Sequence, residues 1–274
     1  MARSAGRERR RRLGRDITIA LGERALAPEW LPERMRLLHR SLGIGAIVDL
    51  ALEAAGPESG LDVERLTDVV TGAGFDQLAT SADRSALKLR LRRARTLPDS
   101  VGPGMRLLVC GLNPSQYAAD AGVPFARRGN RFWSAALAAG VVSVAYDPEH
   151  ALRHHGVGMT DLVKRATPGA DELTAEEYRR GLARVGRLCA WLSPSAVCFV
   201  GLAGWRAAVD RRAGPGLQRA GLSGRPVYVM PSTSGRNAHA DPDSLRDDLL
   251  AALELSDLVA PGKDGVVGET ALEL

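Results

Sequence analysis

The segment from Leu107 to Trp133 reads "LLVCGLNPSQYAADAGVPFARRGNRFW", and it decides the fold class. Its first five residues form an apolar run of strand length that ends on a glycine. The Asn-Pro pair that follows is a strong turn signal, so Asn113 lies just beyond the end of the predicted strand. Helical spacing resumes after Asn130 in "RFWSAALAAG". The segment therefore predicts a strand, a polar loop and a helix.

Two later apolar runs also have strand length: "SAVCFVG" at 195–201 and "RPVYVMPS" at 225–232. Helical segments lie between and after these runs. Strands that alternate with helices indicate a mainly parallel sheet covered on both faces. We therefore expect an α/β fold, a three-layer α/β/α sandwich, over residues 98–255. Ligands bind at the carboxyl ends of the strands in such sheets.

Two of the predicted helices carry clear start signals. Thr174 and Glu177 have the spacing of a capping box at the start of "TAEEYRRGLARVGRLCAWL". Asp241 is the expected cap of "DPDSLRDDLLAALEL", with Pro242 at its first helical position.

The regions outside the sandwich have a different character. Residues 1–16 form an arginine-rich tail that we expect to be disordered, and residues 256–274 form a polar tail. Residues 17–97 show apolar positions at three- and four-residue spacing and predict a helical extension. Within it, "SALKLRLRRARTLPDS" fits both a strand and a helix face. Its basic residues form either a solvated face or a phosphate-contacting one.

The composition limits the class of protein. The 274 residues carry a formal net charge of +5, which makes an anionic partner such as nucleic acid plausible. Cys110, Cys189 and Cys198 show no metal-ligand spacing and are expected to be reduced core residues, too few for the four thiolates of an iron–sulfur cluster. No apolar stretch is long enough to cross a membrane, so we expect a cytoplasmic protein without a membrane partner.

Two loops are predicted to meet at one cleft. "GLNPS" at 111–115 follows the first predicted strand, and "MPSTSGRNAH" at 230–239 follows the last one. Both loops lie at carboxyl ends of strands, where parallel sheets bind their ligands. Either loop alone would be an ordinary turn.

Four motifs, taken in order, resemble one family. "GLNPS", "PFARRGNRFW", "GMTDLVKRATPGADELTAEEYRRG" and "MPSTSGR" look like the successive motifs of the mismatch-specific uracil/thymine-DNA glycosylases, a MUG-like branch of the uracil-DNA glycosylase superfamily. The resemblance runs from Leu97 to Leu255. It implies a uracil-DNA glycosylase-like fold and hydrolysis of the N-glycosidic bond of uracil, or of a damaged pyrimidine such as ethenocytosine, opposite guanine.

The resemblance also implies the partners of the reaction. The substrate is double-stranded DNA with a G·U or damaged-base mispair, whose base is flipped out and removed to leave an abasic site. Neither a cofactor nor a metal is implied, and a monomer is expected.

The resemblance assigns roles to the residues of the base pocket. Asn113 matches the residue that holds the attacking water, and Phe125 matches the aromatic ring on which the base stacks. Backbone N–H groups near Leu112 and Ser115 are expected to bind a base oxygen, and Ser232 matches a polar position that reads the base or assists the water.

The last motif resembles the loop that contacts DNA. Arg236 aligns with the residue that fills the space left by the flipped nucleotide, where it can stack and bind the widowed guanine. Ser234 and Gly235 give the backbone room to approach phosphate. Asn130 is expected to support the Phe125 loop, and Trp133 to lie in the core.

The sequence departs from the family at two positions. Asp161 stands where familiar members carry Lys or Asn; it acts either as a general base or electrostatic stabiliser, or as the cap of a helix over "LVKRAT". Ser115 stands where they carry Gly, and its side chain can narrow the space beside the C5 edge of the base. Thymine is therefore expected to be a poor substrate.

Two other functions stay open for the sequence. One is a non-catalytic lesion-binding protein, and the other is a nucleotide-handling α/β enzyme that cradles phosphate in the first loop. The second is disfavoured because "GLNPS" is neither a GxGxxG nor a Walker loop, and Pro114 removes a donor. The role of residues 17–97 stays open between DNA affinity and structural packing.

Overall fold

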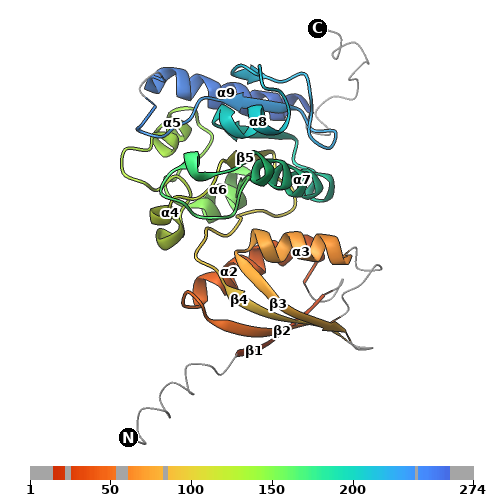
Figure 1. The fold of residues 1–274 in the computed structure, drawn as a ribbon. Coiled ribbons are helices and arrows are strands. Elements are labelled where there is room, and N and C mark those ends of the chain that lie inside the picture. Colours follow the sequence, from red (N-terminus) through yellow and green to blue (C-terminus); the bar gives the residue numbers. More distant parts are fainter. Residues whose placement is uncertain (1–14, 22–25, 54–60, 83–85, 238–239, 260–274) are drawn as a thin grey trace, which may run out of the picture.

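The computed structural model describes residues 15–21, 26–53, 61–82, 86–237 and 240–259. They form two units, each built around its own sheet (Figure 1). The larger unit has a five-stranded sheet and holds all the predicted site residues. Residues 1–14 and 260–274, which make up most of the two predicted tails, lie outside the described residues.

The central sheet of the larger unit has the order β6-β5-β7-β9-β8, and all its neighbouring strands are parallel except the pair β8/β9. Every residue of β5, β6 and β7 is buried, which requires cover on both faces of the sheet. The three strands predicted from the sequence are present as β5, β7 and β9. The strands are β5 (Leu107–Gly111), β6 (Val157–Asp161), β7 (Ala196–Val200), β8 (Gly216–Leu217) and β9 (Val227–Met230).

Alternate residues of β5 enter different hydrophobic cores, because successive side chains of a strand point to opposite faces. Leu107 and Val109 join a core with α5 and α9, while Leu108 and Cys110 join a core with α7 and α8. This arrangement confirms the predicted three-layer α/β sandwich. The helices of this unit are α4 (Gln116–Ala121), α5 (Phe132–Ala138), α6 (Pro148–His155), α7 (Ala175–Leu192), α8 (Leu202–Ala208), α9 (Pro242–Val259) and the 3-10 turn η3 (Ala170–Glu172).

The predicted helix starts are confirmed. Thr174 and Glu177 form a complete capping box at the start of α7. The Asp241 carboxylate accepts a hydrogen bond from the Ser244 backbone N–H at 2.9 Å, ahead of Pro242. Helix α9 continues to Val259, so it extends into the range that was predicted as a C-terminal tail.

The prediction of a helical extension over residues 17–97 is wrong. This unit is an α/β structure with the sheet order β1-β2-β4-β3, in which β1 and β2 are parallel and the other pairs antiparallel. The two segments with the clearest helical spacing, "LPERMRLLHRSLG" at 31–43 and "LDVERLTDVVTGAG" at 61–74, do contain α-helices, but four strands accompany them in the described residues. The elements are β1 (Arg15–Ala20), the 3-10 turn η1 (Pro28–Trp30), α2 (Leu31–Ser41), β2 (Ile47–Glu53), α3 (Val63–Gly72), β3 (Phe75–Ala82) and β4 (Ala86–Arg93).

Strand β4 shows why the sequence was misleading. Leu89 and Leu91 are buried on the core face, as alternate residues of a strand are. In a strand with leucine at every second position, leucines also recur four residues apart, and that spacing matches one face of a helix. Between them, Arg90 and Arg92 are exposed and pair with Asp49 at 3.8 Å and Asp76 at 2.8 Å. Because these charges are neutralised by neighbours, they favour the solvated-face interpretation over phosphate contact.

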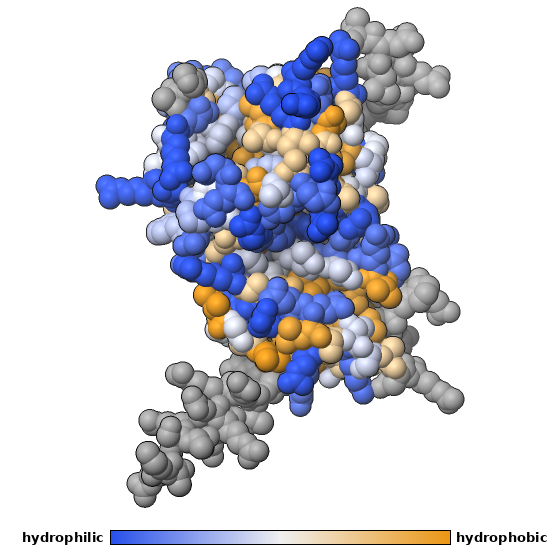
Figure 2. Space-filling view, viewed as in Figure 1, coloured by the Kyte–Doolittle hydropathy of each residue, from blue (hydrophilic) through white to orange (hydrophobic). Residues whose placement is uncertain are grey.

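The two units touch along α3 and α7. Arg187 of α7 binds the Asp68 carboxylate of α3 at 2.6 Å, and the Arg65 guanidinium lies 5.3 Å from the centre of the Trp191 ring. Ser100, in the segment that joins the units, exchanges two backbone hydrogen bonds of 2.8 Å with Met159 of β6. Figure 2 shows a band of hydrophilic side chains at the level where the units meet and apolar patches on the N-terminal unit below it.

Candidate active site

A cavity of about 410 Å³ opens at the carboxyl ends of β5, β6, β7 and β9, the position that a parallel sheet predicts for a ligand. The two loops that follow β5 and β9 both contribute to it, so the predicted shared cleft is present. Every site residue predicted from the sequence except Gly235 lines this cavity: Leu112, Asn113, Ser115, Phe125, Asp161, Ser232, Ser234 and Arg236.

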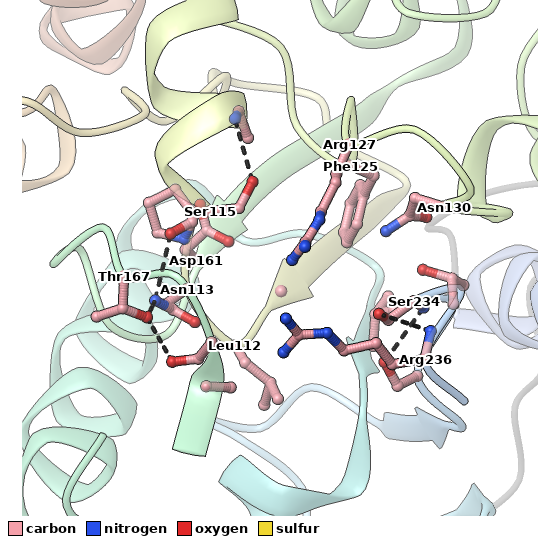
Figure 3. A pocket seen from close by; sticks show the side chains of 18 of the residues that line it. Leu112, Asn113, Ser115, Phe125, Arg127, Asn130, Asp161, Thr167, Ser234 and Arg236 are labelled. Carbon is pink, nitrogen blue, oxygen red and sulfur yellow. Dashed lines mark hydrogen bonds between the residues drawn. The ribbon is translucent and has the colours of Figure 1, made fainter. Parts of the chain in front are cut away.

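The Asn113 side chain is held in one orientation. Its Nδ2 donates to the Thr167 hydroxyl at 2.7 Å (Figure 3). It also donates to the Arg165 carbonyl at 3.0 Å. The Thr167 hydroxyl in turn donates to the Gly169 carbonyl at 2.6 Å, so it can only accept from Asn113. This chain directs the amide N–H groups into the protein and leaves Oδ1 as the acceptor for a water.

Phe125 presents one ring face to the cavity. Its other face stacks on the fully buried Phe132, with ring centroids 4.1 Å apart and an interplanar angle of 23°. Phe125 also has a left-handed backbone with φ of 56°, which is strained for a side chain of this size. The Trp133 Nε1–H donates to the Pro124 carbonyl at 2.8 Å and fixes this turn, and Trp133 is a core residue as predicted.

Asp161 is the last residue of β6, and no helix follows it: residues 162–169 are irregular. The prediction that Asp161 caps a helix over "LVKRAT" is therefore wrong. Its backbone pairs in register with Gly111 at the end of β5. The residue is buried and its carboxyl group lines the cavity. Within the described part of the chain, no group donates a hydrogen bond to this carboxylate.

The electrostatic surroundings of Asp161 are unusual for a carboxylic acid. The pKa of Asp161 is raised to about 6: burial is the main cause and the nearby Asp99 carboxylate adds to it, while Lys164 and Arg184 oppose the shift. A group with this pKa exchanges a proton near neutral pH, which is the property required of a general base. Burial of a carboxylate costs folding free energy, and a perturbed carboxyl group in a cavity is typical of a functional site.

Ser115 begins helix α4, and its hydroxyl accepts from the Ala118 backbone N–H at 3.1 Å. The side chain is therefore held at the cavity wall by a helix cap. Ser115 also forms an isolated parallel bridge with Thr167, so the Asn113 loop and the loop that holds its amide are joined by backbone as well as by side chains.

The loop from Ser232 to Arg236 is shaped by its own hydrogen bonds. The Ser232 hydroxyl accepts from the Ser234 backbone N–H at 3.3 Å, and the Ser234 hydroxyl accepts from the Arg236 backbone N–H at 3.3 Å. Gly235 has a packing role that the sequence did not reveal: a Cβ there would lie 2.7 Å from the Gly129 carbonyl oxygen. The close approach joins this loop to the Phe125 loop.

Two arginines converge on the mouth of the cavity. Figure 3 shows the Arg236 side chain directed inward and the Arg127 side chain beside the Phe125 ring. Arg127 was not singled out in the sequence; its Nη1 donates to the Pro168 carbonyl at 3.4 Å. Asn130 accepts from the Phe132 backbone N–H at 2.9 Å and supports the same loop, as expected.

Some groups stay outside the site. Cys110, Cys189 and Cys198 are free and buried, as predicted. Within the described ranges, no three His, Cys, Asp or Glu side chains are grouped so that they could hold a metal ion, and His239 lies outside those ranges. No helix of the described ranges is long and apolar enough to cross a membrane.

The fold and the cavity define an α/β protein with a strand-end pocket that combines an aromatic ring, a fixed amide and a buried carboxyl group. One similar solved structure is the solution NMR structure of a "putative Uracil DNA glycosylase" from Methanosarcina acetivorans. It has 22% sequence identity and a TM-score of 0.43, with 59% of this chain and 97% of that chain covered.

A sequence model of the Uracil DNA glycosylase superfamily matches residues 98–254, more than half of the chain and almost the whole of the larger unit. The chain belongs to this superfamily. It is therefore a DNA-repair glycosylase, a hydrolase of the N-glycosidic bond that acts on DNA.

Proposed function

We propose that the protein is a monofunctional, mismatch-specific uracil-DNA glycosylase. It hydrolyses the N-glycosidic bond of uracil, or of a damaged pyrimidine such as ethenocytosine, opposite guanine in double-stranded DNA and leaves an abasic site. It acts as a cytoplasmic monomer without a cofactor. The observation that carries the proposal is the convergence of Asn113, Phe125 and Asp161 on one cavity.

Phe125 supports the proposal as a platform for a flipped base. A base inside a duplex cannot reach a cavity at strand ends, so its nucleotide must rotate out, which costs least when the base is mispaired. The exposed face of Phe125 can then stack on the pyrimidine, a contact worth about 1–3 kcal/mol per base. Because Phe132 backs the ring, the platform is already in place before DNA binds.

Asn113 and Asp161 provide two acceptors for one water. The water donates one hydrogen bond to Asn113 Oδ1 and the other to the Asp161 carboxylate, which leaves a lone pair for attack on C1′ of the deoxyribose. Asp161 takes the proton as the water oxygen bonds to C1′. The C1′–N1 bond breaks, and its electron pair leaves with the uracil anion. Backbone N–H groups near Leu112 and Ser115 stabilise the negative charge on the base oxygen.

The surroundings of Lys164 support a monofunctional enzyme. A glycosylase that also cleaves the strand requires a free amine to attack the sugar. Lys164 follows Asp161 closely in the chain, but its ammonium group binds Asp99 at 2.7 Å and its side chain is 9% exposed. Hydrolysis by water is therefore the chemistry that the site favours.

The loop after β9 is proposed to contact the DNA. Arg236 fills the space left by the flipped nucleotide and binds the widowed guanine, while Ser234 and Gly235 let the backbone approach phosphate. Ser232 reads the base at the cavity wall. Ser115, fixed by its cap to α4, narrows the space beside C5 and disfavours thymine.

Single-turnover excision on a G·U duplex, read by alkaline strand cleavage, tests the proposed function. Wild-type protein is expected to release uracil, and Asn113→Ala to react about 100-fold more slowly with similar duplex binding. A matched G·C duplex serves as the control substrate. Tight binding of the G·U duplex without cleavage would instead indicate a lesion-binding protein. A protein that neither binds nor cleaves any of the duplexes would indicate a nucleotide-handling enzyme.

A further inference from the structure

A buried acidic residue, Asp99, lies behind the active-site cavity in the segment that joins the two units. It is 3% exposed, and each of its carboxylate oxygens binds a cation. Oδ1 accepts from Lys164 Nζ at 2.7 Å and from the Thr160 hydroxyl at 2.7 Å, and Oδ2 accepts from Arg184 Nη1 at 2.7 Å. Asp99 thus connects the end of β6, the following loop and helix α7.

Arg184 extends this connection to Asp161. Its Nη2 donates to the Thr160 hydroxyl at 2.9 Å and to the Asp161 main-chain carbonyl at 2.8 Å. The backbone of the proposed catalytic residue is therefore held by Arg184, and Arg184 is held by Asp99. Hydrogen bonds between charged groups at this depth are strong and directional, so the cluster fixes where β6 ends.

The four ionisable groups of this cluster are coupled by charge. Asp99 raises the pKa of Asp161, whereas Lys164 and Arg184 lower it. With Asp161 ionised, two carboxylates balance two cations. Other groups also face Asp161: the Cys110 thiol on β5, Arg36 of α2 across a small cavity, and Arg127 and Arg236 across the main cavity.

The N-terminal unit packs directly against the cluster. A Cβ on Gly72, the last residue of α3, would lie 2.4 Å from Asp99 Oδ2 and 3.0 Å from Arg184 Nη1. The Asp99 backbone N–H donates to the Gly72 carbonyl at 2.8 Å. The Thr96 hydroxyl donates to the Lys164 carbonyl. Only a residue without a side chain allows α3 to approach this closely.

We propose that Asp99 is a positioning residue for Asp161, and that the N-terminal unit acts on the reaction through it because α3 seals the Asp99–Arg184 pair from water. The inference rests on the proposed function, in which Asp161 is the general base. It gives the N-terminal unit a role in the chemistry in place of DNA affinity or packing alone.

Three variants test this role. Asp99→Asn removes the charge of Asp99, Lys164→Gln removes one cation, and Gly72→Ala pushes on the pair from the N-terminal unit while keeping a residue that suits a helix. Glu64→Gln is the matched control, because it removes the 3.4 Å ion pair with Arg187 at the same interface, and Glu64 lies outside the cluster. Two readouts are used: the midpoint of the single-turnover pH–rate profile on a G·U duplex, and the midpoint of the Asp161 carboxyl carbon in a ¹³C NMR titration.

Opposite shifts are expected from the two charge variants. Asp99→Asn lowers both midpoints. It also slows excision at pH 8 by up to about 100-fold, since an Asp161 carboxylate that is displaced from its position activates the water poorly. Lys164→Gln raises both midpoints. Gly72→Ala slows excision, and Glu64→Gln leaves the rate and both midpoints at wild-type values. If Asp99→Asn does not fold, an upward shift of both midpoints in Lys164→Gln still supports the charge coupling between the cluster and Asp161.

Unchanged midpoints in the folded Asp99→Asn and Lys164→Gln proteins would overturn the proposal, and so would equal losses of rate in Gly72→Ala and Glu64→Gln. Failure of the proposed function is distinct: wild-type protein would then release no base from any duplex. The NMR titration requires no activity, so it decides the coupling in that case too.

Discussion

The carboxyl group of Asp161 lies directly against Gly111: a Cβ on Gly111 would come within 2.6 Å of Asp161 Oδ1 and 3.5 Å of Phe125 Cζ. The two residues are register partners at the ends of β5 and β6. Because Gly111 has no side chain, the carboxylate and the aromatic ring can share one end of the cavity.

Gly111→Ala should therefore damage the site more than the fold. The added methyl group must displace Asp161 or Phe125, and a misplacement of about 1 Å can cost about 100-fold in rate. The free energy of unfolding is expected to fall by about 1–3 kcal/mol, as for other overpacked positions. Gly214→Ala is the control, because its Cβ meets no atom within 4 Å. Single-turnover excision and urea unfolding measure the two effects; a wild-type rate in Gly111→Ala would contradict the geometry.

Thr167→Val tests the orientation of the Asn113 amide. Valine keeps the shape of threonine but removes the acceptor at 2.7 Å from Asn113 Nδ2. Two hydrogen bonds of the hydroxyl are lost, the one from Asn113 and the one to the Gly169 carbonyl. The bond that orients the amide is worth about 0.5–1.5 kcal/mol, so excision should slow by about 3- to 10-fold with little change in duplex binding. Thr67→Val, on the exposed face of α3, removes a comparable hydroxyl away from the site. The role of Thr167 fails if both variants react at the same rate.

Asp161→Asn should stabilise the protein above pH 6 while it impairs catalysis. The folded-state pKa of about 6 lies above the usual value near 4, so the folded protein binds the proton more tightly than the unfolded chain does. Stability contributed by the protonated group is consequently lost as the pH rises between these values. Replacing the carboxylate should remove a cost of up to about 3 kcal/mol at pH 8 and much less at pH 4. Thermal unfolding of wild type and Asp161→Asn at pH 4 and pH 8 measures this gain in stability. The same gain at the two pH values would refute the prediction.

Arg236→Ala should weaken binding to a mispaired duplex more than to a matched one. If the guanidinium stacks in the vacated site and binds the widowed guanine, its loss costs about 1–3 kcal/mol of discrimination. Arg236→Lys should recover little, since an ammonium group neither stacks nor binds in a fork. Arg219→Ala removes the charge of another exposed arginine and should leave the preference for the mispaired duplex unchanged. Fluorescence anisotropy with an uncleavable uracil analogue gives the affinities, and a uniform loss in Arg236→Ala would rule out the insertion role.

Phe125→Leu tests the stacking platform. Leucine fills part of the same volume against Phe132 but offers no ring face, so about 1–3 kcal/mol of base stacking should be lost. The expected result is slower excision with nearly unchanged binding to a duplex that already contains an abasic site. If Phe125→Leu loses the same affinity for the G·U duplex as for the duplex with an abasic site, Phe125 only supports the loop.

The sequence predicted those parts of the fold that depend on local signals. "LLVCG" is apolar throughout and ends on glycine, and β5 lies there. The capping box of Thr174 and Glu177 fixed the start of α7. Strand β6 was missed because "VGMTD" has a glycine inside its apolar part and ends on two polar residues, whereas "LLVCG" is apolar up to its last residue. Asp161 was consequently assigned a possible cap role that the structure excludes.

The remaining features depend on contacts between distant parts of the chain. Thr167 orients Asn113 across 54 positions of sequence, and Asp99 binds Arg184 across 85. The close approach of Gly235 to the Gly129 carbonyl also joins two distant loops, and no local sequence signal indicated it. In the N-terminal unit, leucines four residues apart satisfied a helix and a strand equally.

The pH dependence of single-turnover excision, in wild-type protein and in Asp161→Asn, tests the central claim most directly. If the carboxylate of Asp161 activates the water held by Asn113, the wild-type rate rises with pH and levels off above about 6. Asp161→Asn should then be slower by about 10²–10⁴-fold at pH 8 and nearly independent of pH. A variant that matches the wild-type rate and profile on a G·U duplex would contradict the account.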